Sequence, residues 1–382
     1  MDEKDMEKIM DNDLSGPGSS GDATDDLHNA AGAGSESKEA GPSQTHAAPG
    51  PSGGAVGVDI GTSRIVEYHK EGLRFAKNSQ LNASFSVPFS SLTKRMLEQN
   101  EFLYTRKEQN IVVIGDGAGN FANIANRDMG RPMADGVINP NEESGSTIIE
   151  HIVTDMVQRP KNLGAKLCFS IPAPQRDKQN SIVYHETMLR NCFVKIGYFA
   201  KGITEGFLVV LSEMQDNAYT GIGISCGAGL CNVCLSYLSV PIFTFSIAKA
   251  GDYIDNSTAM AVGEHVNRVR VIKEESLDLI DEPKNRIDRA LNIYYEDVIV
   301  SLIQNIKQAM EESENMPKID KPLPIVLSGG TAKPDGFRNK FDNILRESNL
   351  PIEISEVRLA EDPLIATARG AYMAACMEEE EE

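Results

Sequence analysis

The stretch Gly54-Ala-Val-Gly-Val-Asp-Ile-Gly-Thr-Ser-Arg-Ile-Val66 predicts two short strands joined by a tight turn. Val56, Val58 and Ile60 alternate in the way that one buried face of a strand requires. Gly61 then permits a tight turn with a positive φ. We therefore expect a β-hairpin at the start of the folded part of the chain.

The tip of this hairpin has the groups that bind a phosphate. Thr62 and Ser63 offer hydroxyls and backbone N–H groups, and successive amides in a turn form a concavity for anions. Asp59 lies beside them at the end of the apolar strand. Because an acid next to a phosphate requires a cation between the two, the hairpin favours a clamp for Mg²⁺ and a nucleotide phosphate. The alternative for this stretch alone is an ordinary hairpin with a solvated aspartate.

The charge of the 382-residue chain is concentrated at its ends. Residues 1–53 hold eleven acids against three lysines, and residues 378–382 are all glutamate, so the tails account for most of the net charge of −19. This distribution argues against nucleic-acid binding and against docking on anionic lipid. Residues 1–53 are also rich in Gly, Ser, Ala and Pro, which predicts a disordered acidic tail. Binding of a protein partner through the acidic tails is the alternative to a solubilising role.

Neither a signal peptide nor direct membrane insertion is expected, because no long apolar run and no basic segment before one occurs in the sequence. Cys231 and Cys234 match a CxxC pattern without a second close pair. Positions three apart on a strand face opposite ways, which disfavours a zinc site. The six cysteines therefore predict reduced thiols in a cytoplasmic protein.

Strand and helix patterns alternate along the rest of the chain, which predicts a mixed α/β architecture. Gly115-Asp-Gly-Ala-Gly119 follows an apolar strand and suggests a dinucleotide loop, but Asp116 would repel a pyrophosphate and the third glycine is misplaced. The predicted strands lie in residues 72–89, 111–114, 133–138, 166–171, 200–205, 221–237, 243–247, 322–327 and 352–357. The predicted helices cover 147–157, 177–192, 207–214, 253 onwards, 287–312, 336–347 and 364–377.

The opening hairpin has a counterpart later in the chain. Gly223-Ile-Ser-Cys-Gly-Ala228 can be laid on Gly57-Val-Asp-Ile-Gly-Thr62, about 166 residues earlier. This repetition predicts two related halves that each contribute one phosphate-binding turn. A third glycine turn, Ser328-Gly-Gly-Thr331, follows another apolar strand, and the sequence contains no Walker A motif.

In their order and spacing these segments resemble the actin-like, sugar-kinase and DnaK-type ATPases, and among them the MreB-like bacterial actins. The resemblance extends from about residue 54 to residue 377. The segments that carry it are 59–62, 131–138, 203–205, 224–237, 250–252, 272–275, 326–331, 360–363 and 368–370. The resemblance implies the actin-like ATPase fold, with two related ribonuclease-H-like halves around a nucleotide cleft.

The resemblance also implies a division into domains. Domain I would comprise residues 54–205, with helix 362–377 packed back on it, and domain II residues 206–361. The tails 1–53 and 378–382 would flank them. Because only eleven residues separate Glu275 from Ile287, the outer subdomain of domain II would be reduced.

Roles for individual residues follow from the resemblance. Asp59 would hold Mg²⁺ through water, and Glu205 would orient the water that attacks the terminal phosphate. The implied nucleotide contacts are Gly61, Thr62, Ser63, Gly227, Ala228, Gly229, Gly251, Asp252, Lys273, Gly329, Gly330 and Thr331. For Lys273 the alternative is a solvated helix charge, and for Glu205 a helix N-terminal acid.

Two departures from the family pattern bear on catalysis. Ser225 stands where the second phosphate loop has Asp, and Leu230 stands where it has Thr. Losing one such electrostatic contact costs about 10²–10³ in rate. We therefore expect ATP or ADP binding with slow or absent hydrolysis, and nucleotide state controlling filament assembly or partner binding. A DnaK-like nucleotide-gated module that does not polymerise is the alternative, and a sugar or acid kinase is disfavoured because no substrate base is evident.

Overall fold

The computed structural model describes residues 54–125, 127–176, 182–314 and 316–380. The predicted N-terminal tail, the start of the helix predicted at 177 and the last two glutamates lie outside these residues. No helix in the described part of the chain is long and apolar enough to cross a membrane.

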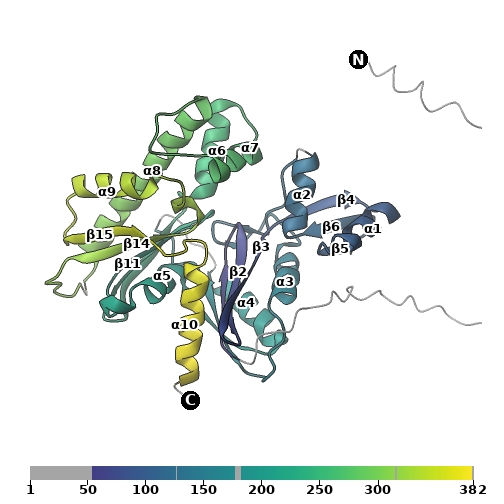
Figure 1. Ribbon diagram of the computed structural model, residues 1–382, viewed down its shortest axis with the longest axis horizontal. Helices are drawn as coiled ribbons and strands as arrows, with labels where there is room; N and C mark the ends of the chain where they lie inside the picture. The colour runs from purple at the N-terminus through teal and green to yellow at the C-terminus, as the bar shows by residue number, and fades with distance from the viewer. Residues whose placement is uncertain (1–53, 126, 177–181, 315, 381–382) are drawn as a thin grey trace, which may run out of the picture. The chain divides into compact units, whose positions relative to one another are not determined.

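Two five-stranded sheets with the same strand order form the centre of the fold (Figure 1). The first has the order β10-β9-β1-β2-β3, and the second the order β15-β14-β11-β12-β13. In each sheet the leading strand pairs antiparallel with the next strand in sequence and parallel with its other neighbour. This correspondence confirms the predicted pair of related halves.

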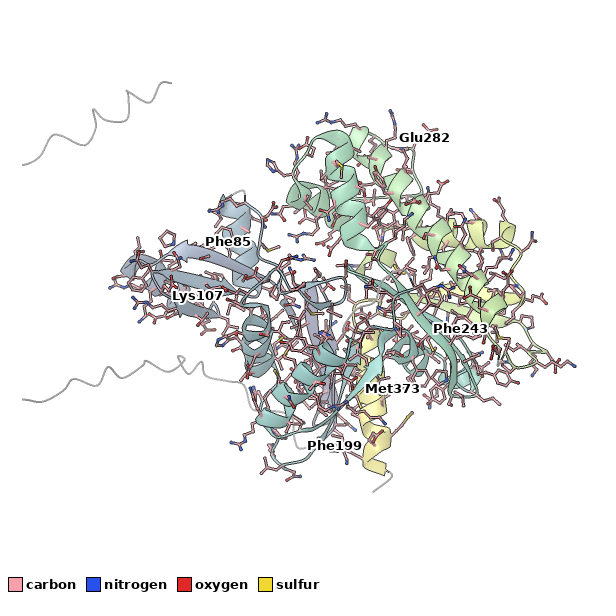
Figure 2. All side chains as sticks on the ribbon, turned by 180° about the vertical axis from the view of Figure 1, so that it is seen from behind. Phe85, Lys107, Phe199, Phe243, Glu282 and Met373 are labelled. Atoms are coloured by element: carbon pink, nitrogen blue, oxygen red, sulfur yellow. The ribbon has the colours of Figure 1, made fainter. Side chains whose placement is uncertain are left out.

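The predicted strands of both sheets are present. The first sheet contains β1 (Val56–Ile60), β2 (Arg64–Glu71), β3 (Arg74–Leu81), β9 (Lys166–Ile171) and β10 (Phe199–Thr204). The second contains β11 (Gly221–Cys226), β12 (Cys231–Tyr237), β13 (Val240–Ile247), β14 (Leu323–Ser328) and β15 (Ile354–Leu359). The labelled Phe199 and Phe243 mark β10 and β13 in Figure 2.

Helices cover the sheets and bury their apolar faces. On the first sheet these are α3 (Gly145–Met156) and α4 (Ile182–Ile196), and on the second α6 (Gly251–Val262), α8 (Arg286–Glu312) and α9 (Phe337–Glu347). The predicted apolar face of α3 is buried as expected. Helix α7 (Val266–Glu275) follows α6, and residues 276–285 between α7 and α8 contain neither helix nor strand.

A smaller three-stranded sheet is inserted after β3. It has the order β4-β6-β5, with β4 (Ser84–Pro88), β5 (Tyr104–Lys107) and β6 (Asn110–Ile114), and carries α1 (Ser91–Gln99) and α2 (Asp116–Ala125). Phe85 and Lys107 lie on it (Figure 2). The GxGxG stretch forms the start of α2 after an antiparallel strand, so it is not a dinucleotide loop. A two-stranded hairpin, β7 (Met133–Ala134) and β8 (Val137–Ile138), turns at Asp135 and Gly136.

Helices α5 (Glu205–Glu213) and α10 (Ala366–Glu380) connect the two sheets. Helix α10 packs on β1 and β9, α5 packs on β11 and β12, and the two helices contact each other (Figure 1). The approach is closest at glycines, because a Cβ atom at Gly57 would overlap the backbone of α10 and one at Gly223 would overlap that of α5. Gly370 of α10 lies equally close to the backbone of α5 at Leu208.

A buried ion cluster strengthens this crossing. The carboxylate of Glu213, at the end of α5, is only 4% exposed and pairs with Arg358 of β15 at 2.8 Å and with Arg369 of α10. Arg369 also pairs with Glu361. One arginine from the second sheet and one from α10 therefore pair with the same buried acid at the end of α5.

We expect Gly57→Val to destabilise the protein by about 1–3 kcal/mol or more, because the added side chain has no room between β1 and α10. The measurement is the free energy of unfolding in urea. Gly54→Val is the control, since a Cβ at Gly54 meets nothing within 4 Å. Equal stability of the two variants would contradict the close crossing.

Candidate functional site

The first loop, residues 61–63, is held by hydrogen bonds from its own hairpin and from Asn82, the residue that follows β3. The N–H of Gly61 donates to the carbonyl of Arg64 at 2.9 Å, and the Asn82 side chain donates to the carbonyl of Gly61 at 3.0 Å. The Asn82 N–H donates to the carbonyl of Ser63 at 2.8 Å. The prediction of a positive φ at Gly61 is wrong. Glycine is needed there because a Cβ would lie 2.6 Å from the Arg64 carbonyl oxygen.

The second loop, residues 227–230, repeats the turn of the first. The N–H of Gly227 donates to the carbonyl of Leu230 at 2.9 Å, as Gly61 does to Arg64. The carbonyl of Gly227 accepts from the Thr331 hydroxyl at 2.7 Å and from the N–H of Gly251 at 3.1 Å. Gly227, Gly251 and Thr331, three of the residues predicted to contact the nucleotide, therefore meet at the Gly227 carbonyl.

The third glycine turn lies against the base of the second loop. Gly329 has a φ of +91°, and a Cβ there would overlap the carbonyl of Cys226. Its N–H donates to the carbonyl of Pro363 at 2.8 Å. The neighbouring Gly330 faces Leu364, whose nearest atom would be 3.7 Å from an added Cβ. The segment before α10 therefore holds this turn in place.

The first and second loops meet. A Cβ at Gly229 would lie 2.5 Å from the hydroxyl oxygen of Thr62 and 2.9 Å from the backbone nitrogen of Gly136. Leu230, only 3% exposed, packs its side chain against Gly136 in the β7–β8 turn. Leu230, which stands where the pattern of the second phosphate loop has Thr, therefore makes an apolar contact between the two halves.

Asp59 and Ser170 form a partly buried pair near the ends of β1 and β9. The Ser170 hydroxyl donates to Asp59 Oδ1 at 2.7 Å and accepts from the N–H of Ile60 at 2.8 Å. Burial raises the pKa of Asp59 to about 6, although the hydrogen bond from Ser170 opposes the rise. The alternative of a solvated aspartate is wrong.

Glu205 begins α5 and faces the second sheet. The Ser225 hydroxyl donates to Glu205 Oε2 at 2.8 Å. Burial raises the pKa of Glu205 to about 8, and the charge of Asp59 contributes to the rise. The two acids therefore lie close enough to interact, which is the arrangement that a cation or a shared proton relieves.

The charges predicted to face the nucleotide are already paired with protein groups. Arg131, which precedes β7, donates to both carboxylate oxygens of Asp252 at 3.0 and 3.1 Å, a contact between the two halves. Lys273 is 8% exposed and donates to Asp255 at 2.8 Å and to the carbonyl of Gly251 at 3.3 Å. The alternative of a solvated helix charge at Lys273 is therefore wrong.

The N–H of Asp252 donates to the carbonyl of Ala228 at 2.7 Å and so joins the start of α6 to the second loop. Gly251 and Asp252 form the first turn of α6, so the second loop rests on the N-terminus of that helix. The structure thus places the three glycine turns and the start of α6 around one point.

The contacts of four polar residues near this site were not predicted from the sequence: Asn82, Arg131, Ser170 and Asn232. Ser170 and Asn232 interrupt apolar strands, and a polar residue within a buried strand is a signal that could have identified them. Arg131 and Asn82 act through contacts with distant segments, for which one sequence offers no signal.

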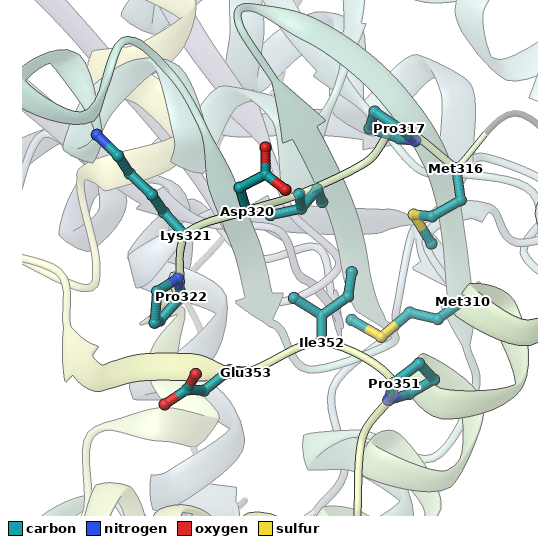
Figure 3. A pocket seen from close by; sticks show the side chains of 10 residues that line it. Met310, Met316, Pro317, Asp320, Lys321, Pro322, Pro351, Ile352 and Glu353 are labelled. Carbon is teal, nitrogen blue, oxygen red and sulfur yellow. The ribbon is translucent and has the colours of Figure 1, made fainter.

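A surface cavity of about 300 Å³ lies away from these residues (Figure 3). It is lined at the end of α8 by Met310 and, in the segments before β14 and β15, by Met316, Pro322 and Ile352 among others. No residue of the three glycine turns lines it. The candidate site is therefore defined by its hydrogen bonds and not by this cavity.

The buried acids predict a pH dependence of stability. Because the folded pKa of Glu205 is raised, the folded chain retains a proton that the unfolded chain releases between about pH 4.5 and about pH 8. The free energy of unfolding should then fall as the pH rises through this window. Glutamine at position 205 cannot ionise, so the Glu205→Gln variant should not lose this stability. Between about pH 5 and about pH 9 its free energy of unfolding should rise by on the order of 1–2 kcal/mol relative to that of the unmodified protein. The gain is limited to this size because the partly exposed side chain is screened by solvent.

Urea unfolding without nucleotide at the two pH values measures this gain. Glu143→Gln is the control, because the Glu143 side chain is 92% exposed and the change should have the same small effect at both pH values. A Glu205→Gln variant that gains nothing at the higher pH would show that Glu205 ionises normally.

Comparison with solved structures shows the same arrangement in other proteins. A MamK double helical filament matches with a TM-score of 0.63 and 19% identity over 84% of this chain and 98% of that chain. MreB5 of Spiroplasma citri bound to AMPPNP matches with a TM-score of 0.57 and 14% identity over 86% and 97% of the two chains. The ethanolamine utilization protein EutJ from Carboxydothermus hydrogenoformans matches with a TM-score of 0.50 and 15% identity over 83% and 88%.

These matches confirm the predicted actin-like ATPase fold. A search of curated protein sequences found no match. The family model named Volactin matches residues 55–375, which include both sheets and every residue of the candidate site. The chain belongs to the volactin family.

Proposed function

We propose that this chain binds ATP and ADP with Mg²⁺ and that its nucleotide state controls assembly into filaments. The observation that carries the proposal is the meeting of the first and second loops at Thr62 and Gly229, with two acids of raised pKa, Asp59 and Glu205, close by. Loops of this kind present backbone amides to phosphate oxygens. The acids then supply the negative charge that a cation bridges to the phosphates.

The chemistry of the donors fits Mg²⁺. Asp59, Glu205, Ser170 and Ser225 offer only oxygen atoms, and Mg²⁺ is held by one or two carboxylates together with phosphate oxygens and waters. The described residues contain no cluster of three or more His, Cys, Asp or Glu that would hold a metal without a nucleotide. Asp59 would be the principal carboxylate, and the ion would neutralise charge on the phosphates when bound.

Hydrolysis should be slow. Glu205 would orient the attacking water, but a pKa near 8 leaves it largely protonated at neutral pH in the absence of ligand. Ser225 cannot offer a second carboxylate, and its hydroxyl is directed to Glu205. The chain thus binds a triphosphate more readily than it cleaves it.

The remaining predicted residues would surround the nucleoside. Gly329, Gly330, Thr331 and Lys273 would enclose the adenosine, and Gly251 and Asp252 would border the phosphates and the ribose. Lys273 acts through its bond to the Gly251 carbonyl, which fixes the start of α6 beside the second loop. Asp252 would have to share its carboxylate between the ribose and Arg131.

Filament assembly is proposed on two supports. The chain has the fold of MamK, which has been solved as a double helical filament, and of MreB5, which has been solved bound to AMPPNP and to ADP. The halves contact each other around the loops, so a bound nucleotide would act on both. The proposed units are domain I (54–205, with the C-terminal helix) and domain II (206–361), in a cytoplasmic protein whose acidic tails would offer a further contact for a partner.

Asp59→Ala should abolish Mg²⁺-dependent binding of ATP, because it removes the principal carboxylate at the phosphates. Isothermal titration with and without Mg²⁺ measures the effect. Asp116→Ala is the control: Asp116 also lies beside the first hairpin but pairs with Arg64 and the N–H of Leu81. Retained ATP affinity in Asp59→Ala would overturn the clamp.

The unmodified protein should sediment as filaments with Mg-ATP and release phosphate about 10²–10³ times more slowly than an actin-like ATPase assayed beside it. Sedimentation and electron microscopy in ATP, ADP and no nucleotide test assembly, and phosphate release tests turnover. Binding without polymer under every condition would favour the non-polymerising nucleotide-gated module. Turnover equal to that of the comparison enzyme would contradict the role assigned to Ser225.

A further inference from the structure

Asn232 is a buried polar side chain, and only one of its two polar atoms, the amide oxygen, has a hydrogen-bond partner in the described part of the chain. It lies on β12, is 0% exposed and pairs in register with Ser225 of β11. Its Oδ1 accepts from the N–H of Ala173 at 2.9 Å, which fixes the orientation of the amide. Its Nδ2 has no hydrogen-bond partner among the residues that the structure describes. A buried donor without a partner is costly, so the site favours a ligand that would accept from it.

The unpaired donor is directed toward the candidate site. The Asn232 side chain lowers the pKa of Glu205 by a hydrogen-bonding interaction, in the same direction as the Ser225 hydroxyl, although Nδ2 forms no hydrogen bond of normal geometry with a described residue. The donor therefore lies beside Glu205 without a well-formed bond to it. An anionic group held between the second loop and Glu205 would lie within its reach.

We infer that Asn232 donates its free side-chain N–H to the terminal phosphate of a bound nucleoside triphosphate, and that this contact distinguishes a triphosphate from a diphosphate. The inference rests on the proposed function, since it needs a nucleotide at the loops. The amide is neutral and donates without adding charge to the site. A diphosphate lacks the third phosphate that would accept the bond, so Nδ2 returns to its unpaired state.

Asn232 also connects the site to the link between the two halves. Ala173, which its Oδ1 holds, follows β9 in the first half. The Ser246 hydroxyl of β13 donates to the carbonyl of Ala173 at 2.8 Å, and the Ser246 N–H donates to the carbonyl of Pro174 at 2.9 Å. One side chain therefore contacts both the predicted position of the terminal phosphate and the segment that joins the sheets.

Asn232→Asp tests the inference. The change keeps the shape and the oxygen that accepts from Ala173, but it removes the amide donor. Affinity for Mg-AMPPNP should fall about 10- to 100-fold, and affinity for Mg-ADP should change less than about 3-fold. Calorimetric titration of each variant measures both affinities. A merely structural role would move the two affinities together.

Asn82→Asp is the matched control. Asn82 is also a fully buried asparagine beside a phosphate loop, but its Nδ2 already donates to the carbonyl of Gly61. The control should weaken AMPPNP and ADP by similar factors, because it loosens the whole first loop. If Asn232→Asp does not fold, as judged by circular dichroism, Asn232→Ala replaces it, with the same expected fall in the ratio of the two affinities.

The outcomes separate the two proposals. If the unmodified protein binds neither nucleotide, the proposed function fails and the inference fails with it. If the unmodified protein binds both and the Asn232 variants weaken both equally, the proposed function stands and Asn232 only supports the second loop. A selective loss of AMPPNP affinity supports the terminal-phosphate contact.

Discussion

The close crossing of α10 over β1 and of α5 over β11 is the constraint on which the site depends. Glycines at these crossings let helix backbone approach strand backbone to a distance that a Cβ would forbid. Asp59 ends the strand that α10 covers, and Glu205 begins the helix that covers the second sheet. The distance between the two acids is therefore set by backbone packing and not by the side chains around them. A loosened crossing would separate the acids before it altered either loop.

Local sequence patterns predicted the elements well and their pairings poorly. Both glycine hairpins, the α3 face and the last helix appear close to where the sequence patterns placed them. Lys273 and Asp252 were assigned to the nucleotide, but each already has a partner, Asp255 and Arg131, on a segment that periodicity does not connect to it. Such pairings depend on how elements pack, and one sequence without relatives carries no signal for them. At Gly61 even the local rule was wrong, because a carbonyl approach rather than a positive φ requires the glycine.

Burial and mutual repulsion disfavour the ionised forms of the two acids of the site, Asp59 and Glu205. Asp59 and Glu205 both have raised pKa values, and the charge of Asp59 is one cause of the rise at Glu205. Without a ligand the folded state therefore keeps protons that solvent would remove, which costs stability as the pH increases. A cation between the acids would lower the pKa of both, because it stabilises both carboxylates at once. Under the proposed function, binding of a cation with a nucleotide would therefore be linked to deprotonation of the acids.

Leu230 and Ser225, the two residues that depart from the pattern of the second phosphate loop, both make contacts between the two halves. Leu230 packs on Gly136 across the two loops, where a threonine would have offered a hydroxyl. Ser225 donates to Glu205, the first residue of the helix that enters the second half, where an aspartate would have repelled it. Leu230 therefore holds the second loop against the β7–β8 turn, and Ser225 holds the start of α5 against β11. Under the proposed function, a site joined in this way would favour a long-lived bound state, in which the presence of nucleotide matters more to the two halves than its cleavage.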